Sequence, residues 1–250
     1  RRRIRGAMGE LLVEAGDSRR AAVHLEEAIG DPATAAEMPR FLLMTAMCRG
    51  LGGEGGLARD MLARVEAATV EAEDVTIRAD LLRVAGLLDT ADDRFDDAAA
   101  SLKRCRDLAR RHGLHHHNAM ASHILGCALL AADKPQKAFA SLWYSYELGR
   151  EHGFERLTRL NLVVLAALDV IHNRTPEPIE RILKSLGQAR ESGLLADILQ
   201  TRYYLGRAFV AAGHYDDGYQ QLEQARRMCR ATGNLLYAAD IERQLAAMGS

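Results

Sequence analysis

The sequence has little proline, few aromatic residues and no excess of either charge, and each shortage narrows the fold and the function. Only 5 of the 250 residues are proline, and 5% are aromatic. Alanine, leucine, arginine and glutamate are abundant instead, and they are among the residues that cost least in an α-helix. The 33 basic side chains nearly cancel the 34 acidic ones, and apart from residues 1–3 there is no basic tract. We therefore expect an all-α protein that binds no nucleic acid through this segment.

Long apolar runs and paired cysteines are also missing. No apolar stretch reaches the roughly 18 residues of a membrane span, and no signal segment opens the chain. The four cysteines, Cys48, Cys105, Cys127 and Cys229, form no C-x-x-C pair and fall within helical patterns. We expect a cytoplasmic protein without a membrane segment, whose thiols are reduced packing residues. Because Arg1 falls inside a helical pattern, we also expect a fragment of a longer polypeptide.

What the sequence does contain is an internal repeat. Glycine closes four related tetrapeptides 40 residues apart, at 110–113, 150–153, 190–193 and 230–233. Two more columns follow the same period, one of small residues and one of large apolar residues: Gly86, Gly126, Ala166 and Gly206, and Leu102, Leu142, Ile182 and Leu222. A fixed period of this length indicates a solenoid. The predicted units are 1–36, 37–76, 77–116, 117–156, 157–196 and 197–234, with a capping helix in 235–250.

Each unit has the pattern of two helices. Apolar residues recur at helical spacing through 116–132, stop at 133–135 and resume at Ala138. Pro135 fits the first turn of a second helix but not a helix interior. The shared glycine at the end of each unit suits the left-handed conformation that closes a helix.

These columns resemble the tetratricopeptide repeat. Leu205-Gly206 with Phe209, and Ala138 with Leu142, match the two halves of its pattern. The resemblance implies a right-handed α-α superhelix of about six helix pairs plus a C-terminal capping helix. The 40-residue period is longer than the usual unit and is similar to the helical sensor regions of bacterial MalT-type regulators.

The resemblance also implies where a partner binds, because the first helix of each pair lines the concave groove. The expected groove residues are mostly apolar: Leu43, Met47, Arg83, Leu87, His123, Cys127, Val163, Ala167, Tyr203 and Arg207. Such a groove suits a protein or peptide segment with apolar anchors, oriented by Arg83 or Arg207. Alternatively, several of these residues pack against adjoining repeats. The groove asparagines that clamp a chaperone tail are missing, and the first helices offer chiefly Asn161 to hold a peptide backbone.

Four local motifs have plainer interpretations. Gly50-x-Gly52-x-x-Gly55 matches a dinucleotide fingerprint but follows a helical pattern, so we interpret it as a turn. His112, His115, His116 and His117 lack the spacing of a metal site. Asp92, Asp93, Asp96, Asp97, Asp216 and Asp217 precede second helices and are expected to cap them. Trp143, Tyr144 and Tyr146 form a partner contact or an inter-repeat filler.

No catalytic motif is present, since H-E-x-x-H, G-x-S-x-G and a nucleophile beside a base are all absent from the sequence pattern. We therefore expect a non-enzymatic protein- or peptide-binding scaffold without cofactor or metal, acting as the sensing part of a bacterial regulatory or signalling protein. The alternative is a self-association module that forms a homodimer within a multidomain enzyme such as a kinase or ATPase.

Overall fold

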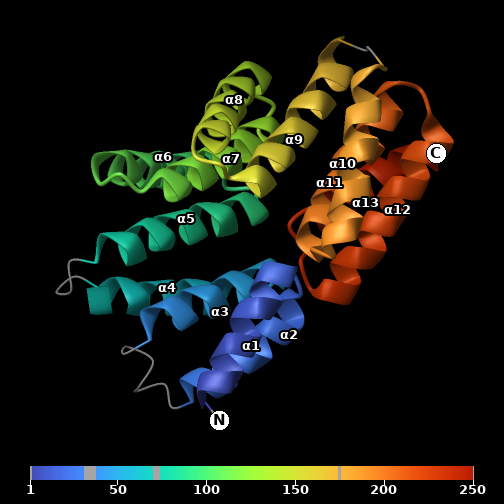
Figure 1. The fold of residues 1–250 in the computed structure, drawn as a ribbon. Helices are drawn as coiled ribbons and strands as arrows, with labels where there is room; N and C mark the ends of the chain where they lie inside the picture. The colour runs from blue at the N-terminus through green and yellow to red at the C-terminus, as the bar shows by residue number, and fades with distance from the viewer. Residues whose placement is uncertain (1, 31–37, 70–73, 174–175, 250) are drawn as a thin grey trace.

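The computed structural model describes residues 2–30, 38–69, 74–173 and 176–249, and within these ranges every regular element is an α-helix. Thirteen helices form six antiparallel pairs and a last single helix (Figure 1). They are α1 (Arg2–Ala15), α2 (Ser18–Ile29), α3 (Pro39–Leu51), α4 (Gly55–Thr69), α5 (Val75–Ala91), α6 (Phe95–Arg111), α7 (His115–Ala131), α8 (Pro135–Glu151), α9 (Glu155–Asn173), α10 (Pro178–Ser192), α11 (Leu195–Ala211), α12 (Tyr215–Thr232) and α13 (Ala238–Met248). The predicted all-α superhelix is confirmed.

We call α1, α3, α5, α7, α9 and α11 the inner helices, and α2, α4, α6, α8, α10 and α12 the outer helices. The inner helices α5, α7, α9 and α11 begin two residues before the predicted starts of their units at 77, 117, 157 and 197. The predicted boundary between residues 36 and 37, together with residues 1 and 250, lies outside the described residues.

The column of small residues and the column of large apolar residues are the two sides of one contact between an inner and an outer helix. A Cβ atom on Gly126 would lie 2.5 Å from Cγ of Leu142, and one on Gly86 would lie 2.5 Å from Cγ of Leu102. Both leucines have no exposed surface. A small residue on the inner helix is therefore what lets the leucine of the outer helix enter the core.

Residues with positive φ close both kinds of turn. Between units, Gly113, Gly153, Gly193 and Gly233 have φ between 67° and 71°, as predicted. Within units, a second column with the same period has positive φ: Gly53, Asp93, Asp133 and Gly213. Glycine and aspartate are among the residues that tolerate this conformation, so the second column was also readable from the sequence.

The aspartates before the outer helices do not cap them in the way we expected. Asp96 and Asp97 lie in the first turn of α6, where their negative charge interacts favourably with the helix dipole. The N-cap residue is Arg94, however, and its side chain makes no capping hydrogen bond. The same holds for Asp216 and Asp217 in α12. Asp92 is instead the C-cap of α5, and Asp93 is the positive-φ residue of the turn. The capping prediction was therefore wrong for the cap position.

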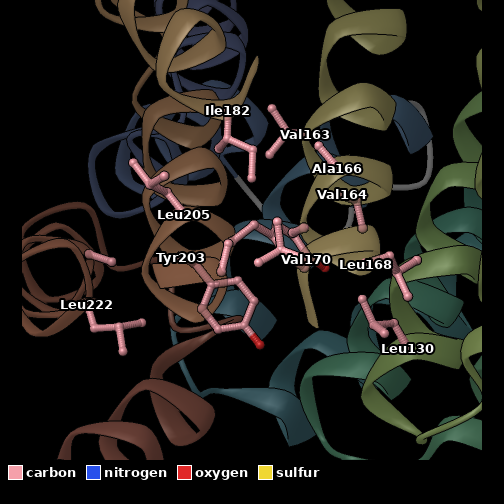
Figure 2. Close-up of a cluster of buried hydrophobic side chains, with 14 of the residues drawn as sticks. Leu130, Val163, Val164, Ala166, Leu168, Val170, Ile182, Tyr203, Leu205 and Leu222 are labelled. Atoms are coloured by element: carbon pink, nitrogen blue, oxygen red, sulfur yellow. The ribbon is translucent and has the colours of Figure 1, made fainter. Parts of the chain in front are cut away.

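The largest core in the described part of the chain joins α7 to α13 across the last three units. Figure 2 shows its side chains, with Val163 of α9 near Ile182 of α10, and Leu205 of α11 in the same cluster. One separate core joins α2 to α5, and another joins α5, α6 and α7. The solenoid is thus packed unit against unit, as a repeat protein requires.

The two ends of the superhelix meet. The backbone N–H of Leu235 donates to the carbonyl of Leu51 at 2.8 Å, and Nη2 of Arg19 donates to the carbonyl of Arg230 at 2.8 Å. In Figure 1 the first and last helix pairs lie at the same side of the molecule, and α2 contacts α12. The units therefore complete about one superhelical turn and close into a ring.

The closure also shortens the predicted capping helix. The sequence pattern predicted a helix from Leu235, but α13 begins at Ala238. Because the backbone of Leu235 bonds to Leu51, the residues before α13 reach across to α3 instead of continuing the helix. None of the helices in the described part of the chain is long and apolar enough to cross a membrane.

Candidate functional site

The inner helices surround a cavity of about 520 Å³ at the centre of the ring. Its wall is formed by α3, α5, α7, α11 and the start of α9, and residues 234–243 and the turn after α1 contribute at the closure. This volume is within the range of about 300–1,000 Å³ that holds small ligands in proteins. The cavity is the candidate site.

Seven of the ten predicted groove residues line this cavity, and three do not. The lining residues are Met47, Arg83, Leu87, His123, Cys127, Tyr203 and Arg207. Leu43, Val163 and Ala167 are at most 3% exposed and pack within the cores. Figure 2 shows Val163 in the interior rather than on a surface. Partner binding by the ten residues stays a prediction. Because Val163 is buried, a charged residue placed there would disturb folding and would not report on binding.

One wall of the cavity carries a cluster of α5 and α7. Arg83 donates to Oδ1 of Asp80 from Nε at 3.1 Å and from Nη2 at 2.8 Å, and His117 Nε2 lies 3.6 Å from the same oxygen. Burial acts to raise the pKa of Asp80, but hydrogen bonding to His117 and the charge of Arg83 prevail and lower it to about 2. Asp80 is therefore ionised, and the Nη1 group of Arg83 has no bond to a described residue.

A second cluster joins α9 to α11. Asp197 is 1% exposed and accepts hydrogen bonds from Nε and Nη2 of Arg156 at 2.7 to 3.0 Å, and from Nη2 of Arg159 at 3.3 Å. Arg156 and Asp197 both line the cavity. The bidentate pair fixes the start of α11 against α9 and places a satisfied charge pair at the rim.

The third cluster lies at the closure. The hydroxyl of Tyr203 donates to Asp240 at 2.8 Å and accepts from Nη1 of Arg207 at 2.9 Å, and its ring stacks on Tyr237 at 4.4 Å between centroids. Burial raises the pKa of Tyr203 well above its ordinary value, so the phenol stays protonated. The sequence pattern did not predict residues 237–243 as cavity residues, because they belong to the predicted cap, whose position depends on the ring closure.

A fourth, buried cluster spans three inner helices. His123 of α7 contacts Asn161 of α9, Gln200 of α11 and Cys127 one turn along α7. Asn161 has no exposed surface and is fully used by these internal bonds. Asn161, the asparagine that the sequence offered for a peptide backbone, therefore links inner helices instead of facing a ligand.

The remaining predicted motifs lie outside the cavity or at its edge. Gly50 lies in the last turn of α3, Gly52 is the C-cap of α3 and Gly55 begins α4, so the motif spans the turn between the two helices, as we interpreted it. Among the histidines, His115 stacks on His152, and His116 and His117 reach the cavity. No group of metal-binding side chains is present among the described residues. The cysteines are free, and Cys48, Cys105 and Cys229 are buried, while Cys127 is only partly buried.

The aromatic side chains of α8 lie on the outside of the ring. Trp143 is 47% exposed and stacks on Phe139, which is 51% exposed, and it also contacts Tyr146. Tyr144 is 36% exposed, and its hydroxyl accepts a hydrogen bond from Asn118 of α7 at 3.0 Å. We call Phe139, Trp143 and Tyr146 the α8 aromatic patch.

No protein-family model and no curated protein matches the sequence. Among solved structures, the chain is similar to a Rap protein in complex with competence and sporulation factor, with a TM-score of 0.71 and 13% identity over 98% of this chain and 74% of that one. It is similar to a STAND protein with a tetratricopeptide repeat sensor from Pyrococcus horikoshii, with a TM-score of 0.62 and 13% identity over 98% of this chain and 38% of that one. The TPR-like repeats of a kinesin light chain from Podosopora anserina match with a TM-score of 0.50 and 17% identity over 78% and 95%. At these identities the likeness shows the fold, which is of the tetratricopeptide type.

Proposed function

From this ring of tetratricopeptide-type repeats, we propose that the chain is a binding scaffold that takes a short peptide segment into its central cavity. The observation that carries the proposal is the cavity itself, about 520 Å³ in volume and lined by the inner helices of most units. In repeat proteins the inner helices form the concave surface that meets a partner.

The lining suits a peptide with apolar side chains and both kinds of terminal charge. Met47, Leu87 and Met120 offer apolar surface. The lining also carries four arginines, Arg83, Arg156, Arg207 and Arg243, and five carboxylates, Glu14, Asp80, Asp93, Asp197 and Asp240. Such a mixed lining does not favour a polyanion, whereas a peptide supplies a carboxylate, an ammonium group and apolar anchors together. The Nη1 group of Arg83, which bonds to no residue in the described ranges, is a donor for a peptide carboxylate or carbonyl.

The structural neighbours support this proposal. The Rap protein was solved with competence and sporulation factor bound, and the repeats of the STAND protein are described as a sensor. We extend this to a role for the present chain as the sensing part of a cytoplasmic bacterial regulatory or signalling protein. This role needs only reversible binding in the cavity and no chemical reaction there.

The proposal is tested by screening short synthetic peptides against the purified chain by thermal shift and measuring the affinity of those that bind by calorimetry. Leu87→Asp places a charge in the apolar part of the cavity wall, so it should lower the affinity for the peptide by at least about tenfold. Leu57→Asp on the outer helix α4 makes the same substitution at a side chain that is 43% exposed and outside the cavity.

Equal affinity of both folded variants for the peptide would contradict binding in the cavity. Circular dichroism of each variant shows whether it is folded. Absence of any binding peptide from a library that samples all residue types would contradict the peptide class.

The second candidate function is self-association, and the α8 aromatic patch favours it. Phe139 and Trp143 are exposed and stack on each other, and the partly buried Tyr146 contacts Trp143, so one outer helix carries an aromatic surface of the kind found in protein interfaces. Trp143→Ser and Phe139→Ser together should then lower the dimer fraction in sedimentation velocity at high concentration. A wild-type chain that stays monomeric at all concentrations would exclude this function.

A further inference from the structure

A cysteine and a histidine lie side by side in the wall of the cavity, and a buried asparagine lies behind the histidine. His123 and Cys127 are four residues apart on α7 and therefore share a face of that helix. Sγ of Cys127 lies 3.8 Å from Nε2 of His123, and Nδ1 of His123 lies 3.0 Å from Oδ1 of Asn161 on α9. A thiol next to a base that is oriented by a third side chain is the arrangement that activates a nucleophile.

The surrounding hydrogen bonds decide which ring nitrogen of His123 carries the hydrogen. The hydroxyl of Ser145 donates to the carbonyl of Ala119 at 2.7 Å, so it accepts from Nδ2 of Asn161 at 2.9 Å. The same Nδ2 donates to the carbonyl of Leu157 at 2.9 Å, which uses its second hydrogen. Oδ1 of Asn161 only accepts, so Nδ1 of His123 must be the donor. Nε2 is then the basic nitrogen, and it faces Cys127.

Two side chains of α11 complete the surroundings of the thiol. The hydroxyl of Tyr204 is hydrogen-bonded to Cys127, which stabilises a negative sulfur. Nε2 of Gln200 lies 3.1 Å from Nε2 of His123, and no described residue bonds to its carboxamide oxygen. The amide can donate to the neutral ring, or turn over and accept from the protonated one. Gln200 also lines the cavity, so its unused capacity is available to a ligand.

The other three cysteines show what this environment changes. Burial raises the pKa of Cys48 to about 12, and that of Cys105 and Cys229 to about 11. Burial also acts to raise the pKa of Cys127, but the charge of His123 and the hydrogen bonds from His123 and Tyr204 outweigh it, and the pKa falls below its ordinary value. Only Cys127 among the four lines the cavity.

We propose that Cys127 is a nucleophilic thiol that binds an α,β-unsaturated carbonyl compound covalently inside the cavity. The thiol proton passes to Nε2 of His123, Sγ bonds to the β-carbon, and the electrons of the C=C π bond move onto the carbonyl as an enolate. The α-carbon then takes the proton back from His123, so the addition needs no oxidant and releases no leaving group. Gln200 stands beside the reacting atoms and hydrogen-bonds the enolate oxygen.

This site goes beyond the peptide-binding function and is independent of it, because reversible docking of a peptide needs no nucleophile. The reaction ends in a stable thioether and is stoichiometric. A chain modified at Cys127 would carry a group within the cavity.

The test uses N-ethylmaleimide, a small α,β-unsaturated imide, on the folded full chain at neutral pH. Aliquots are quenched over time, and mass spectrometry of the peptides gives the rate at each of the four cysteines. Burial raises the pKa of the other three thiols, whereas His123 and Tyr204 lower that of Cys127, so Cys127 holds the largest thiolate fraction of the four at neutral pH. Its lower basicity offsets part of the gain in rate. Cys127 should therefore react at least about tenfold faster than Cys48, Cys105 and Cys229.

A matched pair of variants separates activation from simple access. Tyr204→Phe removes the hydroxyl that bonds to Cys127, so it should slow alkylation of Cys127 several-fold. Tyr144→Phe removes a hydroxyl that lies on α8 outside the cavity and bonds to Asn118 instead, so it should leave the rate unchanged.

Comparable rates at all four cysteines of the wild-type chain would overturn the proposal, whether or not the variants fold. So would alkylation of Cys127 that is equally fast in both tyrosine variants, because access alone would then explain it.

Discussion

Replacing Gly126 by alanine tests the contact on which the repeat is built. The new Cβ would lie 2.5 Å from Cγ and 2.8 Å from Cδ2 of Leu142, and 3.3 Å from the carbonyl oxygen of Ala138. Leu142 has no exposed surface and belongs to the largest core, so it has no room to turn away. We therefore expect α7 and α8 to separate slightly when the methyl group is added.

The magnitude follows from two opposing effects. Overpacking a core of this kind costs about 1–3 kcal/mol, while alanine in place of glycine gains up to about 1 kcal/mol in a helix interior. Gly126→Ala should thus destabilise the chain by about 1 kcal/mol. Gly187→Ala is the matched control, because it lies within α10 with nothing inside 4 Å of the added Cβ. It should stabilise the chain by up to about 1 kcal/mol.

The assay is urea unfolding followed by circular dichroism, with both variants and the wild-type chain in one series. The midpoints should move in opposite directions for the two variants. A Gly126→Ala midpoint that rises as much as that of Gly187→Ala would refute the close approach of inner and outer helices at this column.

Three further predictions concern the closure and two ion pairs. Gly16→Ala places a Cβ 2.4 Å from the backbone nitrogen of Ala196 and should open the ring, which small-angle X-ray scattering would record as a larger radius of gyration; Gly213→Ala has similar positive φ but nothing within 4 Å and should leave the radius unchanged. The pKa of Asp80 is about 2 in the folded chain, against an ordinary 3.8, so its ionised form stabilises the fold by about 2 kcal/mol. This stabilisation is present above about pH 4 and is lost as the pH falls toward 2. In acid unfolding, the stability of Asp80→Asn should therefore change less with pH over this range than that of the wild-type chain. Asp197→Asn removes a buried partner of two arginines and should lower the free energy of unfolding by about 2 kcal/mol or more in urea, whereas exposed Asp107→Asn should change it by under about 0.5 kcal/mol.

The local parts of the fold were readable because they depend on neighbouring residues in the sequence. Gly126 and Leu142 are 16 residues apart and meet within one helix pair, so one column predicts the other. The left-handed glycine at 153 follows from the end of a single helix. Such features repeat with the period, and the period is visible without any coordinates.

The ring closure was not readable, since it is the sum of small rotations between successive units. No pattern in the sequence pairs Leu51 with Leu235 or Arg19 with Arg230. For the same reason the cap residues that reach the cavity were missed.

The candidate site was only partly readable, and the fifth unit shows why. Counting by the repeat places Val163 at the groove position that His123 holds one unit earlier. However, α9 packs closely on α10 and α11, so Val163 is 1% exposed. The contacts of His123 with Asn161 and Gln200 likewise depend on how three inner helices lie side by side.

The central claim, that a peptide binds inside the ring, is tested most directly by locating a bound peptide on the chain. A peptide from the screen is synthesised with a photoreactive group, irradiated in the complex, and its cross-links are mapped by mass spectrometry. Cross-links should fall on cavity residues of α5, α7 and α11, such as Leu87, Met120 and Tyr203. Cross-links confined to the outer helices, for example to the α8 aromatic patch, would contradict the claim.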